Sequence, residues 1–350
     1  MTSTFEGLAP EEQLKAWKGR AEDERPSLGT GYPSIDSKLF RRGFQPGTFV
    51  ILGGRTHTRK TSVALNIIVN LLREDIPVGF VGLDENTAAY IAKLCSVMTG
   101  EHDALDPEWL EENWNEREAH EARKRYLSDT FSKMNEKSNL TITRGYRPGL
   151  GTLQAWLEDA DGNRPHVVLI DFLGLLARGK FSGQDNTRIP RLAEDVSVWT
   201  NENGLVTIAL HQVSRQRNEL GQSNHGDRPC TLEQLKYGGE EYADVVLGTY
   251  RPSLNYLGNL SEEQAEEETA DKDEKWKERW EKARDRVQRY QHSTFLQLLK
   301  NRPSMKGLNL TGVELVNPAS SMFMCEYDAG QHDDEQASVY NKESKRASSD

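Results

Sequence analysis

A strand, a tight loop and a helix follow one another from Phe49 to Leu72, and this unit constrains the fold more than any other stretch. The apolar run Phe49-Val50-Ile51-Leu52 ends at Gly53-Gly54. Beyond Lys60, apolar residues recur at three- and four-residue steps, which predicts a helix. The chain is therefore expected to fold as an α/β protein, organised around this unit.

The loop between this strand and helix matches the phosphate-binding pattern G-x-x-x-x-G-K-[ST], except that Arg59 replaces the second glycine. In such a loop, backbone N–H groups and a helix N-terminus surround phosphate oxygens. Lys60 would reach the outer phosphates, and the Thr61 hydroxyl would bind Mg²⁺. The predicted nucleotide-binding residues are Gly54, Arg55, Thr56, His57, Thr58, Arg59, Lys60, Thr61 and Ser62.

Arg59 is the one departure from that pattern. A residue other than glycine in the left-handed conformation costs about 1–2 kcal/mol. The loop is therefore expected either to take another shape or to carry strain. The residues alone leave an ordinary strand-to-helix turn as an equal alternative to nucleotide binding.

The composition fits a globular protein with a sizeable core. Of the 350 residues, 36% are hydrophobic and 28% charged. The net charge of −11 argues against a protein that coats polyanions, but it allows nucleic acid in a narrow basic channel. Residues 1–20 lack the apolar core of a signal peptide, and the longest apolar stretch is too short to cross a bilayer, so we expect a cytoplasmic location.

The cysteines give no sign of a metal site or a disulfide framework. Cys95, Cys230 and Cys325 lie far apart, without a C-x-x-C pair. Buried, reduced thiols are the simplest expectation.

Two further apolar runs end in carboxylates. Residues 76–83 lead into Asp84 and Glu85, and residues 167–170 lead into Asp171. Open parallel sheets bind ligands at the carboxyl ends of their strands. Asp171 could therefore reach Mg²⁺ or its bound water.

The run from Thr30 to Asn66 resembles the opening of the helicase domain of DnaB-type replicative helicases, the RecA-like motors of superfamily four. Thr56, His57 and Arg59 stand where that family has one proline and two glycines. The resemblance extends over residues 28–326 and implies a RecA-like P-loop NTPase core with a mostly parallel central sheet.

The resemblance also implies catalytic roles. Asp84, with Glu85 beside it, takes the place of the glutamate that orients the attacking water, and Asp171 ends the Walker B strand and binds Mg²⁺ with Thr61. Gln212 follows a strand in the place of the γ-phosphate sensor. Lys300 and Arg302 have the Lys-x-Arg spacing of a strand that reaches the ATP of a neighbouring subunit.

Two polar, basic stretches are expected to contact DNA in the channel of a ring. They span residues 178–191, for which a solvent-exposed surface loop is the alternative, and residues 215–237, which the resemblance assigns to DNA contact. The predicted DNA-contacting residues are Arg178, Lys180, Arg188, Arg215, Arg217 and Lys236.

The remaining segments complete the expected organisation. Residues 1–27 form a lead-in with an amphipathic helix, 28–330 the ATPase domain and 331–350 a disordered tail. Within the domain, residues 261–292 form a charged helical insertion whose two tryptophans pack on the body, with a partner-binding arm as the alternative.

Together these features predict an ATP- and Mg²⁺-dependent replicative DNA helicase that moves along single-stranded DNA as a ring. The trans-acting Lys300 and Arg302 imply a homo-oligomer, most simply a hexamer. The compact chain favours a phage protein, and the short lead-in makes primase coupling doubtful. Two alternatives stay open: a recombination- or clock-type RecA-family ATPase, and a non-hydrolysing DNA-binding or loader-like ring protein.

Overall fold

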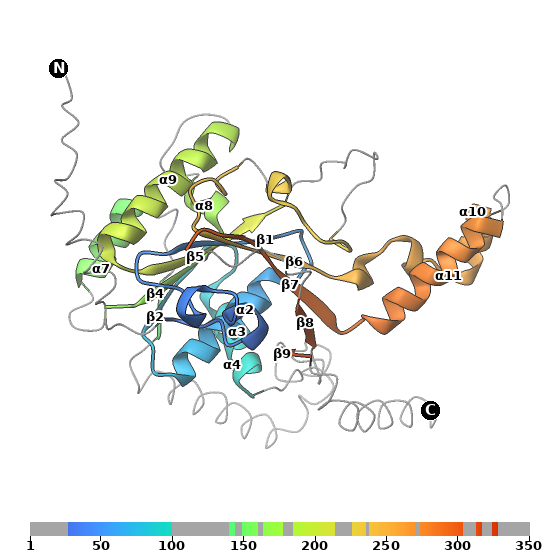
Figure 1. Cartoon of the computed structure of the whole chain (residues 1–350), viewed down its shortest axis with the longest axis horizontal. Helices are drawn as coiled ribbons and strands as arrows, with labels where there is room; N and C mark the ends of the chain where they lie inside the picture. The colour runs from blue at the N-terminus through green and yellow to red at the C-terminus, as the bar shows by residue number, and fades with distance from the viewer. Residues whose placement is uncertain are drawn as a thin grey trace.

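A nine-stranded sheet forms the centre of the molecule (Figure 1). The computed structural model describes residues 27–99, 140–143, 149–159, 164–177, 185–213, 226–235, 238–269, 274–303, 313–316 and 324–327. The predicted N-terminal helix and the polar tail lie outside these residues.

Six strands of the sheet are parallel and three are antiparallel. The parallel strands are, in spatial order, β3 (Leu140–Thr143), β2 (Val78–Gly82), β4 (Val167–Asp171), β5 (Val206–Gln212), β1 (Phe49–Gly54) and β6 (Val245–Tyr250). The antiparallel strands β7 (Ser293–Asn301), β8 (Val313–Val316) and β9 (Cys325–Glu326) extend the β6 edge. The predicted α/β class is confirmed.

Both faces of the sheet are covered by helices. On β1, Val50 and Leu52 point into one apolar cluster, while Phe49 and Ile51 point into the other. Because the strands are buried on both faces of the sheet, their sequences are continuous apolar runs. The first cluster includes residues of α2 (Pro33–Asp36), α3 (Lys60–Arg73) and α4 (Thr87–Thr99), and the second those of α7 (Leu150–Asp159), α8 (Leu173–Ala177) and α9 (Asp185–Asn203).

Helix α9 begins earlier than its sequence indicated. The basic stretch of residues 178–191 is predicted to be a loop, but the helix starts at Asp185 and includes Pro190. Ile189 is buried with Leu192 in the second core cluster, which extends the helical spacing of apolar residues by a turn. Arg188 therefore lies on a helix and not in a loop.

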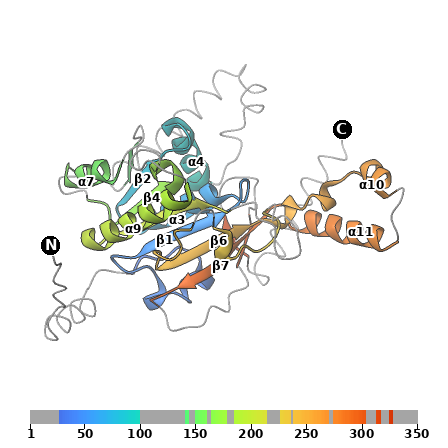
Figure 2. The ribbon, with the colours of Figure 1, turned by 90° about the horizontal axis from the view of Figure 1, so that it is seen from above.

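The insertion forms a two-helix arm that projects from the body beyond β6 and β7 (Figure 2). It comprises the 3-10 helices η3 (Pro252–Leu254) and η4 (Leu257–Asn259), followed by α10 (Glu262–Thr269) and α11 (Glu274–Arg289). Trp280 is buried with Leu260 and Ala265, and Trp276 packs against them. The prediction that the tryptophans pack on the body is wrong, because the arm has a small core of its own.

The last two described strands are short. They are β8 and β9, at residues 313–316 and 325–326, and residues 304–312 and 317–323 lie outside the part of the chain that the structure describes. Among the described helices, none has the length and apolarity that a membrane span requires.

The small core of the arm makes Trp280→Ala a test of its independence. Removing a buried tryptophan costs about 3–5 kcal/mol. Amides of α10 and α11 should therefore lose hydrogen-exchange protection while those of β1 and β6 keep theirs. Trp276→Ala is the control with the smaller expected effect, because Trp276 is only partly buried. Equal loss of protection in the central strands would show that the arm and body form one cooperative unit.

Candidate nucleotide-binding site

The phosphate-loop sequence lies at the carboxyl end of β1 and leads directly into α3. Gly54 ends the strand, and a Cβ atom at this position would lie 2.6 Å from the Thr58 Oγ1 atom. Thr58 Oγ1 is also 2.8 Å from Thr249 Oγ1 on β6. Glycine is therefore required at residue 54, because the loop folds back closely over the end of its own strand.

Hydrogen bonds within the loop converge on one carbonyl group. The Thr58 hydroxyl donates to Arg55 O at 2.8 Å, and Lys60 Nζ donates to the same oxygen at 2.8 Å. Burial lowers the pKa of Lys60 to about 8. A buried cation that donates to a neutral carbonyl would be stabilised further by an anion, as a phosphate group would provide.

Arg59 adopts the left-handed conformation, with φ 60° and ψ 33°. The prediction had left open whether the loop changes shape or carries strain, and it carries strain. His57, at φ 65°, is a second left-handed residue in the loop. Among the described residues, no side chain caps the start of α3. The first amides of this helix can consequently donate to an anion in the loop.

Two arginines lie close together beside the loop. Arg251, just after β6, donates from Nη1 to His57 O at 3.2 Å. Burial lowers the pKa of Arg59, and burial together with the Arg59 charge lowers the pKa of Arg251 to about 10. Within the described part of the chain, Arg59 Nη1 is buried and has no hydrogen-bond partner. This arrangement adds positive charge to a loop that already contains Lys60.

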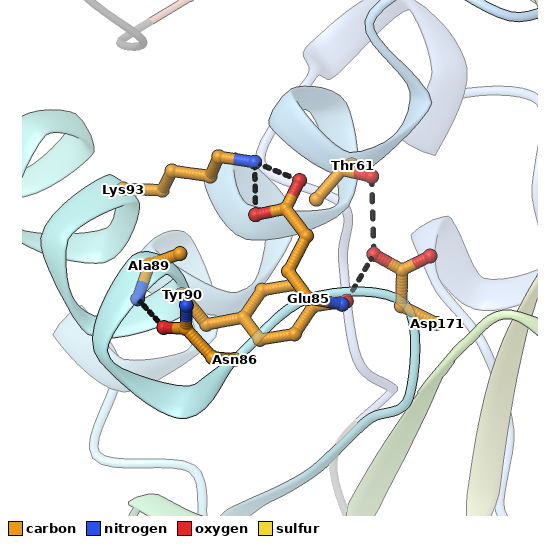
Figure 3. Close-up of polar contacts among 7 residues, drawn as sticks. All are labelled: Thr61, Glu85, Asn86, Ala89, Tyr90, Lys93 and Asp171. Carbon is orange, nitrogen blue, oxygen red and sulfur yellow. Dashed lines mark hydrogen bonds and ion pairs between the residues drawn. The ribbon is translucent and has the colours of Figure 1, made fainter.

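The Asp171 carboxylate lies beside Thr61 at the start of α3 (Figure 3). Asp171, at the end of β4, is 4% exposed and accepts hydrogen bonds at Oδ2 from Thr61 Oγ1 and Tyr90 Oη, both at 3.1 Å. Burial raises its pKa to about 6. A buried carboxylate beside a hydroxyl offers the hard oxygen ligands that suit Mg²⁺, which usually binds one or two protein oxygens together with phosphate and water.

The two acids after β2 have different surroundings. Glu85 forms an ion pair with Lys93 of α4. Asp84 is exposed, and its charge is among the smaller influences on the pKa of Lys60 and of Asp171, raising both. Asp84 is thus the acid whose charge acts on both the Lys60 ammonium and the Asp171 carboxyl.

Gln212 lies beside the loop, at the end of β5. Its Cα pairs in the sheet with that of Gly54, and the next amide, Val213 N, donates to Gly54 O at 3.1 Å. Arg55 Nη1 in turn donates to Val213 O at 3.3 Å. Gln212 is therefore joined to the loop by the backbone pairing with Gly54 and by the hydrogen bonds of the next residue, Val213.

Lys300 and Arg302 lie at the amino-terminal ends of the parallel strands, opposite to the ends that carry the phosphate loop. Because β7 is antiparallel, its end at Asn301 pairs with Val245 at the start of β6. Roughly 13 Å of β6 separates this point from Thr249, which touches the phosphate loop. Lys300 and Arg302 donate to the carbonyl groups of Glu240 and Glu241. Neither side chain is placed to reach the loop of its own chain.

Most of the predicted DNA-contacting residues lie outside the described part of the chain. These are Arg178, Lys180, Arg215, Arg217 and Lys236. Arg188 is described and is half-buried on α9. DNA contact by these side chains remains a prediction.

Three contributors to the site were missed in the sequence. Tyr90 lies on α4, Thr249 lies on β6 and Arg251 directly follows that strand. For Thr249 and Arg251, the position at the carboxyl end of a strand parallel to β1 could have indicated a part in the site. Nothing local in the sequence indicated the Tyr90 hydrogen bond to Asp171.

Comparison with protein families gives one matching model. The DnaB-like helicase C terminal domain matches residues 27–294. Among curated proteins, the replicative DNA helicase DnaB of Helicobacter pylori J99 is 24% identical over 250 residues, covering 70% of this chain and 47% of the relative. That of Rickettsia bellii is 26% identical over 279 residues, covering 73% and 51%. The chain thus spans about half the length of these relatives.

Solved structures agree on the fold. A DnaB-like replicative helicase, described with its primase interactions, superposes with a TM-score of 0.62 at 19% identity and covers 92% of this chain and 67% of its own. A KaiC-like protein of Pyrococcus horikoshii gives a TM-score of 0.52 at 15% identity, covering 86% of this chain and 99% of its own. The predicted RecA-like fold is confirmed.

The strain at Arg59 can be measured by comparing two substitutions. Arg59→Gly and Arg59→Ala both remove the buried guanidinium, but only glycine adopts the left-handed conformation without cost. The glycine variant should be more stable than the alanine variant by about 1–2 kcal/mol in denaturant unfolding. Equal stability would mean that Arg59 is not held left-handed in solution.

Proposed function

The chain belongs to the DnaB-like helicase C-terminal domain family, and from this we propose that it is an ATP- and Mg²⁺-dependent helicase subunit that works on single-stranded DNA as a ring. One observation carries the proposal. Lys60, Thr61, Asp171 and Gln212 converge at the carboxyl edge of the parallel strands. This is where open α/β sheets bind nucleotides.

Each group has a part in phosphoryl transfer. Lys60 and the first amides of α3 would bind the phosphates, and Thr61 with Asp171 would hold Mg²⁺. The ion would neutralise charge on the phosphate oxygens. Asp84 would orient the attacking water, and its exposure leaves space for water beside it. Gln212 would relay the state of the phosphates to the segment that follows it.

The position of Lys300 and Arg302 supports action between subunits. Both lie at the ends of the strands that are opposite to the phosphate loop of their own chain. In a head-to-tail ring, that edge of one subunit can meet the nucleotide site of its neighbour. A planar, permanently charged guanidinium suits the spread charge of the transferring phosphoryl group. We infer that Arg302 acts in trans, that Lys300 assists it, and that the ring is most simply a hexamer.

Steady-state ATP hydrolysis, with and without single-stranded DNA, tests the ATPase assignment. We expect DNA to stimulate turnover and Lys60→Ala to abolish it, because the lysine is the main cation of the loop. Arg302→Ala should retain nucleotide binding and lose turnover by about 10³-fold or more. Turnover equal to wild type in both variants would refute the site assignment.

Mixing the two inactive variants tests action in trans. Interfaces that combine an intact Lys60 from one subunit with an intact Arg302 from the next should restore up to roughly a quarter of wild-type activity in a random ring. Lys60→Ala mixed with wild type is the control. No recovery, although mixed rings form, would argue that both residues serve the same subunit's site.

The two acids after β2 are separable by isosteric substitution. Asp84→Asn should bind ATP normally but lower turnover by about 10²-fold or more, since a general base contributes about 10²–10⁴-fold. Glu85→Gln is the matched control and should change turnover little, because Glu85 is paired with Lys93. The reverse result would assign the base to Glu85.

A second candidate function is a ring protein that binds nucleotide and DNA without hydrolysis. The strained Arg59 and the short, exposed Asp84 favour it, since both depart from the family pattern at the reacting groups. Nucleotide and DNA binding with no turnover would select this alternative. A recombination-type ATPase would hydrolyse ATP and fail to unwind a forked duplex.

A further inference from the structure

The arm is fixed to the body at the edge of the sheet that carries the phosphate loop. It leaves the body after β6, where Arg251 Nη2 donates to Gln291 O at 3.4 Å. Phe295 of β7 lies between two tyrosines, with ring centroids 4.9 Å from Tyr250 and 5.4 Å from Tyr290. These contacts give the arm a defined direction.

The two helical parts of the arm are also closely packed. A Cβ atom on Gly258 would collide with the backbone of Ala283, so η4 and α11 meet almost without side chains between them. Arg284 forms an ion pair with Glu262 of α10, and its guanidinium lies 5.2 Å from the Trp280 ring centroid. These contacts hold helix α11 in a fixed position against η4 and α10.

A line of cations runs along α11. Its basic residues recur at steps of four, three, four and three, which places them one above the other along the helix. All five are exposed. We call this line the cationic stripe, and its members are Lys275, Arg279, Lys282, Arg286 and Arg289.

Most of the stripe is not neutralised within the described part of the chain. Lys282 pairs with Glu278, and Arg289 lies over the Tyr290 ring. The side chains of Lys275, Arg279 and Arg286 form no ion pair or hydrogen bond with any residue that the structure describes. The ion pair that joins the two helices uses Arg284, which lies outside the stripe.

The unpaired cations of the stripe take no part in the packing that holds the arm together. Like charges three and four residues apart destabilise a helix. Its members do not enter the small core formed by Leu260, Ala265 and Trp280. Exposed cations that take no part in this packing are the surface expected of a binding site.

The dimensions of the stripe suit a linear polyanion. It spans about 14 residues of α11, or about 21 Å. Duplex DNA carries one negative charge per about 1.7 Å of its axis, so several phosphates would lie within reach. The chain as a whole carries −11, so the positive row differs in sign from the average of its own molecule.

We propose that the cationic stripe of α11 binds the phosphate backbone of nucleic acid. The contacts are electrostatic and independent of base sequence. The site is separate from the nucleotide loop and from the segments predicted to face a channel. It does not require ATP hydrolysis, so it can be tested whether or not the chain is a motor.

The test is binding of the full-length protein to a short, blunt-ended DNA duplex, without nucleotide, over a range of KCl concentrations. The variant is Lys275→Gln/Arg279→Gln/Arg286→Gln, which removes the three unpaired cations and keeps good helix formers. The matched control, Arg41→Gln/Arg42→Gln/Lys277→Gln, removes three exposed cations outside the stripe. Circular dichroism and thermal unfolding check that both variants are folded.

The stripe variant should bind at least about tenfold more weakly at low salt, and the slope of log K against log[KCl] should fall by about 2–3, since each phosphate contact contributes about 0.9. The control should stay within about twofold of wild type. Equal losses in both variants, or no loss in either, would overturn the proposal. A changed oligomeric state with unchanged DNA affinity would also overturn it and assign the stripe to a second copy of the chain.

Discussion

The site depends on one backbone conformation, the left-handed turn at Arg59 that joins β1 to α3. This turn aims the first amides of α3 at the loop and places Lys60 and Thr61 on its inner side. The conformation is costly for a residue with a side chain. It persists because β1 and most of α3 are buried on both sides of it, so the surrounding fold determines the path of the loop.

The directions of the strands decide which residues can act together. Parallel β1, β2, β4 and β5 bring Asp84, Asp171 and Gln212 to the edge that holds the loop. Antiparallel β7 carries Arg302 to the other edge. If Arg302 acts in trans as proposed, assembly in a ring would bring it to the loop of the neighbouring subunit.

The sequence predicted the strands, the loop and the acidic groups well, because each is a local pattern: an apolar run that ends in a glycine or a carboxylate. It did not predict the partners of these groups. The Tyr90 bond to Asp171 and the Arg251 bond to His57 join residues far apart in the chain. The tryptophans of the arm were misassigned for a similar reason, since periodicity shows that a helix has an apolar face but not what covers that face.

The most direct test of this account is an experimental structure with Mg²⁺ and a non-hydrolysable ATP analogue. We expect the β- and γ-phosphates in the loop, with Arg59 still left-handed, the ion held by Thr61 and Asp171, and Arg302 of a neighbouring subunit near the γ-phosphate. A nucleotide bound elsewhere, or a loop that abandons the left-handed turn when phosphate binds, would contradict the claim that the strained loop is the nucleotide site.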